Sequence, residues 1–150
     1  MVAADANDVA YYLVEKFSKE GRPLTNIKLQ KVLYFSWIHF YNSCKQPLFR
    51  QQFSAWRFGP VIDDVYFRYR VYAAMPIYEP LGKQKELPAY ITKFLDTMFS
   101  KYKDTSPSQL VNMAHKEGGA WDKVYREGDR GIPLPFSVII RYDCPRFADG

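Results

Sequence analysis

The sequence predicts a mainly α-helical fold: one compact domain over residues 1–150, with about five to seven helices around a buried central helix. Three observations lead to this prediction. Apolar residues recur at helical spacing between recognisable start and stop residues. One stretch, VLYFSWIHFY at 32–41, is apolar nearly all round, which is typical of a buried helix. The 150 residues are 47% hydrophobic and 17% aromatic, enough for a core, and no repeat or long linker divides them.

The first two helices are predicted from periodicity and from the residues that end or cap them. Apolar residues at helical spacing predict a helix from about residue 7 to residue 19, which Gly21 and Pro23 terminate. Thr25 or Asn26 can cap the next helix, which extends over about residues 26–42. This second helix contains the apolar stretch and is therefore the central one.

The middle of the chain is predicted to pass from extended backbone into a helix. Residues 48–58 are compatible with a short extended or hairpin segment in which Trp56 points inward and Arg57 outward. Gly59 interrupts this run, and Pro60 suits the first position of a helix over about 60–73. The residues expected on the buried stripe of that helix are Val61, Ile62, Val65, Tyr66 and Tyr69.

The second half is predicted to contain an exposed loop followed by shorter helices. The loop covers 76–88, and an amphipathic pattern then predicts a helix over 87–102. Ser106 as cap and Pro107 at the first position mark another helix, which ends before Gly118. Residues 120–126 are predicted as a short helix, and 137–142 as helix rather than strand.

The net charge is +5, and the basic residues are unevenly placed. No acidic residue lies between Glu20 and Asp63. Six basic residues do: Arg22, Lys28, Lys31, Lys45, Arg50 and Arg57. Such a segment can attract nucleic acid or an acidic protein surface, but its charges are spread out rather than clustered. A phage or mobile-element regulator that binds nucleic acid through residues 21–62 is therefore the alternative function.

Other features narrow the class of protein. The sequence contains no apolar run long enough to cross a membrane, and its first residues lack the apolar core of a signal peptide. Cys44 and Cys144 lie far apart without CxxC spacing, which favours a reduced intracellular protein over a disulfide or metal site. We therefore expect a cytoplasmic protein that has no membrane association and no metal.

Few residues indicate catalytic chemistry. Glycine-rich phosphate loops, GxSxG and HExxH are absent. Asp63 and Asp64 are adjacent, so on a helix they diverge by about 100°, and pairing with a basic residue of 21–62 suits them better than catalysis. His115 lies near a helix end, where a cap or buried hydrogen-bond partner is the commoner role. We expect neither an enzyme nor a cofactor; a hydrolase using His115 and a carboxylate is the third hypothesis.

Two lysines near the start of the central helix stand out, because the positive end of a helix dipole disfavours cations. They are Lys28 and Lys31. One interpretation is a solvated helix face. The other is that both are held there for contact with an acidic partner or an internal carboxylate.

Three blocks of the sequence resemble the Panacea antitoxin domain family, also described as phage-associated GepA-like and SocA-like proteins. The blocks are PLTNIKLQKVLYF at 23–35, PLFRQQFSAWRFGPVIDDVY at 47–66 and LVNMAHKEGGAW at 110–121. The residues that match the family pattern are Lys28, Leu29, Gln30, Lys31, Leu33, Tyr34, Phe35, Trp56, Gly59, Pro60, Val61, Val65, Tyr66, His115, Glu117 and Trp121. The resemblance covers most of the chain, residues 8–142.

The resemblance implies a helical protein-binding module that neutralises a toxin by direct contact, in one type of relative as an adaptor that delivers the toxin to a protease. The implied partner is a toxin encoded by a neighbouring gene. A protease and a second copy are further candidate partners, whereas nucleic acid is not expected. We expect Trp56, Val61, Val65 and Tyr66 to anchor the scaffold in the core, and loop 76–88 to influence partner choice. The candidate partner-binding residues are Lys28, Lys31, Arg57, Asp63, Asp64 and His115.

Overall fold

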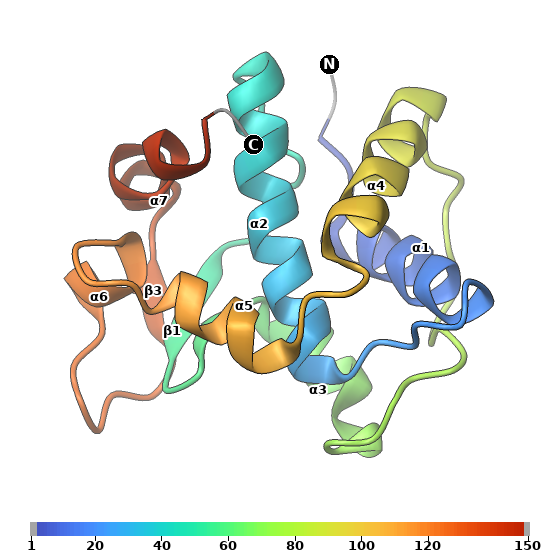
Figure 1. The fold of residues 1–150 in the computed structure, drawn as a ribbon, viewed down its shortest axis with the longest axis horizontal. Helices are drawn as coiled ribbons and strands as arrows, with labels where there is room; N and C mark the ends of the chain where they lie inside the picture. Colours follow the sequence, from blue (N-terminus) through green and yellow to red (C-terminus); the bar gives the residue numbers. More distant parts are fainter. Residues whose placement is uncertain (1–2, 149–150) are drawn as a thin grey trace.

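The computed structural model describes residues 3–148, and within them the chain forms seven α-helices, two short 3-10 helices and three strands. Helix α2 (Asn26–Cys44) runs through the middle (Figure 1). On one side lie α1 (Ala6–Lys19) and α4 (Ala89–Tyr102), and on the other α6 (Ala120–Val124), α7 (Phe136–Tyr142) and a small sheet. The predicted mainly α-helical fold around a buried central helix is confirmed.

Burial of α2 follows from its apolar sequence and from neighbours on every side. Every residue from Lys28 to Phe40 is buried, because α1, α3, α4, α5 and the strand β2 all pack against this helix. The Thr25 hydroxyl accepts from the Lys28 amide and caps its start. Trp37 stacks on Phe136 of α7 with ring centroids 4.5 Å apart. The core therefore sits around α2, and residues near its N-terminus reach the sheet.

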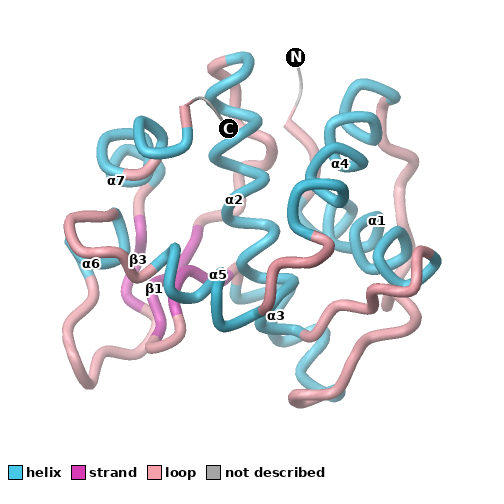
Figure 2. Tube along the Cα trace, viewed as in Figure 1, coloured by secondary structure: helices cyan, strands magenta, loops and turns pink. Residues whose placement is uncertain are grey.

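The sheet is antiparallel, with strand order β2-β1-β3. Figure 2 shows its strands in magenta as a small part of a mostly helical chain. Its strands are β1 (Phe53–Trp56), β2 (Gly59–Val61) and β3 (Ile132–Leu134). Trp56 pairs with Gly59 across the hairpin, and Phe53 pairs with Leu134 on the other side. The hairpin lies where the extended segment is predicted, whereas β3 has no counterpart among the sequence predictions.

The predicted helix over 60–73 is wrong in its start and its length. Pro60 belongs to β2 and pairs with Ala55, and the helix α3 begins later and is shorter (Asp63–Tyr69), followed by the 3-10 helix η1 (Arg70–Tyr72). Because β2 lies at the edge of the sheet, the missing N–H of Pro60 costs no ladder hydrogen bond. Pairing with β1 thus overrides the preference of proline for a helix start.

Two of the predicted core anchors, Trp56 and Tyr66, lie outside the core. Alternation along β1 buries Phe53 and Ala55, so Trp56 is on the opposite face and half-buried. Helix α3 buries Val65 and Tyr69, four residues apart, which leaves Tyr66 39% exposed. Val61 and Val65, the other two anchors, are buried as predicted.

The C-terminal half follows its local signals closely. Helix α5 (Pro107–Ala114) begins with a capping box in which Ser106 and Gln109 exchange side-chain and backbone hydrogen bonds. The predicted helices over 87–102, 120–126 and 137–142 correspond to α4, α6 and α7. A second 3-10 helix, η2 (Cys144–Phe147), ends the described chain. The loop over 76–88 is mostly exposed, with Ile77 and Leu87 buried.

Across residues 3–148, no helix combines the length and the apolarity needed to cross a bilayer. Exposed and half-exposed ion pairs lie along α1. One example is the pair of Lys16 and Glu20, whose charged atoms are 3.4 Å apart. Such surface pairs contribute little to stability, whereas the burial of apolar side chains is the dominant favourable contribution to folding.

Candidate functional site

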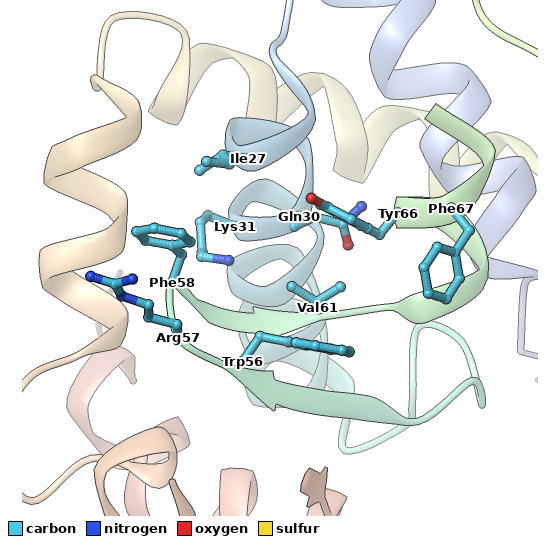
Figure 3. A pocket seen from close by; sticks show the side chains of 9 residues that line it. All are labelled: Ile27, Gln30, Lys31, Trp56, Arg57, Phe58, Val61, Tyr66 and Phe67. Carbon is cyan, nitrogen blue, oxygen red and sulfur yellow. The ribbon is translucent and has the colours of Figure 1, made fainter. Parts of the chain in front are cut away.

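A pocket of about 380 Å³ opens where the N-terminal part of α2 meets the β1–β2 hairpin and α3 (Figure 3). Its lining residues are Ile27, Gln30, Lys31, Trp56, Arg57, Phe58, Val61, Tyr66 and Phe67. Most of these side chains are apolar or aromatic, and the volume lies in the usual range for ligand pockets. The pocket joins the first two motif blocks of the sequence, which are therefore neighbours in space.

Gly59 creates the space that Lys31 occupies. Its backbone has a φ of 110°, a conformation that disfavours any L side chain. A Cβ at this position would lie 2.8 Å from Lys31 Cε, well inside the contact distance. The amine of Lys31 extends toward β2, where Nζ donates to the Pro60 carbonyl oxygen at 2.8 Å (Figure 3). The glycine thus allows both the turn and the approach of the lysine.

Lys31 is a buried cation without a carboxylate partner. Its side chain is 1% exposed, and none of the ion pairs within residues 3–148 includes it. Burial lowers the pKa of its amine to about 7, because the charged form loses its hydration. An ammonium has three N–H donors, and the one hydrogen bond found for Lys31 uses only one of them. The wall of the pocket therefore offers unused hydrogen-bond donors.

Gln30 fixes the hairpin and α3 to α2. Its amide nitrogen donates to Asn26 Oδ1 at 3.1 Å, and its Oε1 accepts from the Ile62 amide at 2.9 Å. Asn26 in turn donates to the Tyr66 carbonyl at 3.1 Å. Because both ends of the Gln30 amide are engaged, this side chain holds the walls of the pocket in place and has a structural role.

The predicted pairing of Asp63 or Asp64 with a basic residue is not found among the described residues. Asp63 accepts from the Trp56 indole N–H at 3.0 Å and from the Ser54 hydroxyl at 3.0 Å, so it ties α3 to β1. Asp64 is exposed in the first turn of α3, where the helix dipole favours a carboxylate. Arg57 is exposed in the hairpin turn, with its guanidinium 5.5 Å from the centre of the Phe58 ring.

His115 lies at the C-terminal end of α5 in a stack of aromatic rings. Its ring is 3.7 Å from that of Trp121 and nearly parallel to it, and the Trp121 indole N–H donates to the Trp56 carbonyl at 2.7 Å. Burial, and secondarily the charge of Lys31, lowers the pKa of His115. Its buried Nε2 has no hydrogen-bond partner. His115 occupies the C-cap position of α5 as predicted, but the hydrogen bond expected for a buried histidine ring is not found in the described part of the chain, and the ring packs behind the hairpin instead.

Lys28 lies away from the pocket and is also buried. Its amine donates to the Lys103 carbonyl at 3.2 Å and lies 5.6 Å from the centre of the Phe17 ring. Burial lowers its pKa. The expected solvated face and the expected internal carboxylate are both wrong for Lys28 and Lys31, since each amine binds a backbone carbonyl instead.

Other residues of the basic segment make their contacts outside this pocket. Arg22 pairs with Asp104 at 3.0 Å, and Lys45 lies over the Tyr41 ring at the opposite end of α2. Within residues 3–148, no group of three or more metal-ligating side chains comes together, and Cys44 and Cys144 are unpaired. The pocket is thus the site that the geometry favours.

Comparison with known proteins identifies the family. The family described as "Antitoxin SocA-like, Panacea domain" matches residues 29–122, which include nearly all of the pocket lining. The chain belongs to this family. Antitoxin SocA of Caulobacter vibrioides (strain NA1000 / CB15N) is 30% identical over 160 aligned residues, covering 97% of this chain and 83% of that protein. No solved structure matches the chain.

Family membership supports an antitoxin type of function and explains why the motif residues are clustered. In this Panacea domain the first block supplies the pocket wall (Gln30 and Lys31), and the second supplies the hairpin and α3. Sequence reasoning missed Ile27, Phe58 and Phe67, which line the pocket and are exposed. An available signal was the aromatic residue directly before Gly59, because a turn leaves such a ring outside the core.

Replacing Gly59 with alanine is expected to destabilise this Panacea domain by about 2 kcal/mol or more, because the new Cβ combines an unfavourable φ with overlap on Lys31 Cε. Urea unfolding followed by circular dichroism measures the loss. Gly118→Ala is the matched control, since Gly118 has a φ of 82° but no atom within 4 Å of the added Cβ. Equal losses in the two variants would show that the contact with Lys31 contributes nothing.

Proposed function

We propose that this protein is an antitoxin that neutralises a partner toxin by direct contact, and that the contact surface is the pocket with its apolar rim. The apolar rim consists of Ile27, Phe58, Tyr66 and Phe67, which are 36%, 53%, 39% and 49% exposed. These four side chains surround one concavity, and this observation carries the proposal. Exposed apolar residues that gather around a hollow are typical of protein-binding sites, where aromatic residues are enriched.

The rim is mounted on rigid elements, which favours tight binding. Tyr66 and Phe67 belong to α3, whose entrance and backbone are hydrogen-bonded to Gln30 and Asn26 of α2. Phe58 occupies the turn of a hairpin that Asp63 and Trp121 also hold. A surface fixed in this way loses little conformational entropy on binding. The same arrangement places a central pocket inside an exposed apolar ring, as in interface hot spots.

The candidate partner-binding residues divide between direct and supporting roles in this proposal. Arg57 and Lys31 line the pocket and would contact the toxin directly, and the exposed Asp64 lies in the first turn of the same α3 helix that supplies Tyr66 and Phe67. The supporting residues are Lys28, Asp63 and His115, whose side chains are held inside the protein by the contacts described above. Partner choice then depends on the rim as well as on loop 76–88.

Replacing Phe67 with aspartate is expected to weaken toxin binding at least about tenfold, because a charge replaces an apolar rim contact. The assay co-expresses the protein with the product of its neighbouring gene and measures growth rescue and co-purification. Tyr90→Asp is the matched control, because Tyr90 is a helical aromatic residue, 44% exposed on α4 and outside the pocket lining. Failure of the wild type to bind or rescue contradicts the antitoxin proposal; equal binding by both variants contradicts the rim as its surface.

The same co-expression distinguishes blocking from delivery to a protease. If contact alone neutralises the toxin, the toxin accumulates in a stable complex. If the protein is an adaptor, the half-life of the toxin shortens when the wild-type protein is present and lengthens with Phe67→Asp. Either result follows from the same contact surface.

A further inference from the structure

Resting on the proposed function, we infer that the pocket receives an apolar side chain of the toxin together with a neighbouring aspartate or glutamate. In this arrangement the carboxylate binds the amine of Lys31 in the wall of the pocket and the guanidinium of Arg57 at its mouth. The partner chemistry is thus an acidic segment with an apolar anchor, rather than an apolar anchor alone.

The polar groups of the pocket point to this partner, because two of the three lining side chains with hydrogen-bond capacity to spare, Lys31 and Arg57, are cations, and the third is the neutral hydroxyl of Tyr66. Gln30 uses both ends of its amide within the protein, and the Trp56 indole N–H is bound by Asp63. The Lys31 amine has one acceptor, the Pro60 carbonyl, and the Arg57 guanidinium extends from the exposed hairpin turn. In Figure 3 the Phe58 ring lies between the Lys31 amine and the Arg57 guanidinium, so the ring separates the two cations when no partner is bound.

Charge complementarity decides the sign of the partner. The pocket lining contains two cations and no acidic residue. Asp63, the carboxylate that accepts from Trp56 of the lining, is engaged by Trp56 and Ser54. A buried amine without an anionic partner is costly to keep charged, and a carboxylate that reaches it forms a charge-assisted hydrogen bond in a water-poor environment. The apolar remainder of the lining requires an apolar body beside that carboxylate.

Access to Lys31 depends on Phe58. The lysine is 1% exposed, whereas the Phe58 ring beside it is 53% exposed in the turn between β1 and β2. Rotation of an exposed side chain is fast and needs no change of backbone. An entering apolar side chain can take the place of the ring and leave its carboxylate partner within reach of the amine.

Binding of this kind takes up protons, so the affinity for the toxin depends on pH. Without a partner the pKa of Lys31 is lowered to about 7, and a bound carboxylate raises it. Affinity therefore decreases as pH increases above 7. The charged or titratable groups around Lys31 are His115 on α5, Arg57 in the hairpin turn, and Asp63 and Tyr66 on α3. His115 titrates below its ordinary pKa of 6.5, outside the range from pH 7 to 9.

The test measures the affinity of the neighbouring-gene toxin for four forms of the full-length protein between pH 7 and 9. The forms are the wild type, Lys31→Met, Arg57→Met and, as control, Lys93→Met. Methionine keeps the apolar stem of lysine and removes the amine, and Lys93 is exposed on α4 outside the pocket. At pH 7 we expect Lys31→Met to bind the toxin at least tenfold more weakly than the wild type does. Arg57→Met is expected to bind several-fold more weakly, and Lys93→Met with unchanged affinity. The wild-type affinity is expected to fall at least tenfold by pH 9, with a flat profile in Lys31→Met.

The other outcomes contradict either the carboxylate inference alone or the proposed function together with it. If the toxin binds the wild type and Lys31→Met with the same affinity and the same pH profile, the carboxylate inference is wrong while the proposed function stands. If the toxin does not bind the wild type at any pH, the proposed function falls and the inference falls with it. Should Lys31→Met fail to fold, the pH profile of the wild type decides, and a flat profile overturns the inference.

Discussion

Replacing Asp143 with alanine is expected to lower the free energy of unfolding by roughly 3–5 kcal/mol, the range for breaking one side of a buried ion pair. Asp143 is fully buried after the end of α7. Its Oδ1 accepts from the Ala120 amide at 2.9 Å and from Arg146 Nη1 at 2.8 Å, and its Oδ2 accepts from the Tyr34 hydroxyl. One carboxylate thus joins the central helix, the start of α6 and the final 3-10 helix.

The cost arises because two partners of Asp143, the Tyr34 hydroxyl and the Ala120 amide, are buried and cannot turn to water. The Tyr34 hydroxyl belongs to a fully buried side chain, and burial together with the Asp143 charge raises the pKa of this phenol. Arg146 also donates to the Met113 carbonyl at 3.1 Å, so it is held in place when the carboxylate is gone. Removing Asp143 therefore leaves a buried hydroxyl and a buried amide with unmet hydrogen bonds, and it removes the carboxylate that pairs with Arg146.

Urea unfolding of four variants tests this account. Asp143→Ala is compared with Tyr34→Phe, which removes one donor and is expected to cost about 1–2 kcal/mol, and with the double variant, which is expected to cost less than the sum. Asp104→Ala is the control, since Asp104 forms an exposed pair with Arg22 and its loss is expected to leave the unfolding midpoint nearly unchanged. A similar midpoint for Asp143→Ala and Asp104→Ala would contradict the structural role of the buried carboxylate.

The sequence predicted those parts of the fold whose signals are local. Helix α5 is an example, because Ser106, Pro107 and Gln109 form a start signal within four consecutive positions. Strand β3 is the opposite case. Its three residues, Ile132–Leu134, become a strand only by pairing with β1, far away in the sequence. Pro60 was wrongly predicted at a helix start for the same reason, because helix preferences give no information about its pairing with Ala55.

The sequence predicted only part of the candidate site, because the site depends on contacts between residues that are distant in the sequence. The sequence marks Lys31 by its place near a helix start and Gly59 as a chain break, and both match the family pattern. Their contact, however, links positions 28 residues apart, and no local pattern shows that a lysine fits against a glycine. Burial of a lysine is also contrary to its ordinary preference, so a solvated face was the natural expectation. Asp143 carries no motif, and only the structure brings it to Tyr34. The features that were not predicted from the sequence thus depend mostly on contacts between distant segments.

The stability of the protein is expected to increase with pH above 7, and Lys31→Met is expected to remove about 3 kcal/mol of that increase between pH 7 and 9.5. In the unfolded chain the lysine binds its proton with the ordinary pKa of 10.5, but in the folded protein burial lowers the pKa to about 7. Between these two values the unfolded state binds more protons than the folded state. Lowering the pH through this range therefore favours unfolding, and raising it favours folding.

The difference between the two proteins isolates Lys31 from the other perturbed groups, including Cys144, whose pKa burial raises from 9.0 to about 11. His39, whose pKa burial lowers to about 4, and His115 titrate below pH 7. The buried tyrosines, among them Tyr102, have raised pKa values, so they lower stability only above pH 10. Lys28 also has a lowered pKa, but it is present in both proteins and cancels in the difference. The measured quantity is the difference in unfolding free energy between wild type and Lys31→Met, from urea unfolding at each pH, with Lys93→Met as control. A constant difference from pH 7 to 9.5 would show that the amine of Lys31 keeps its ordinary pKa in the folded protein, and that its burial next to Gly59 carries no electrostatic cost.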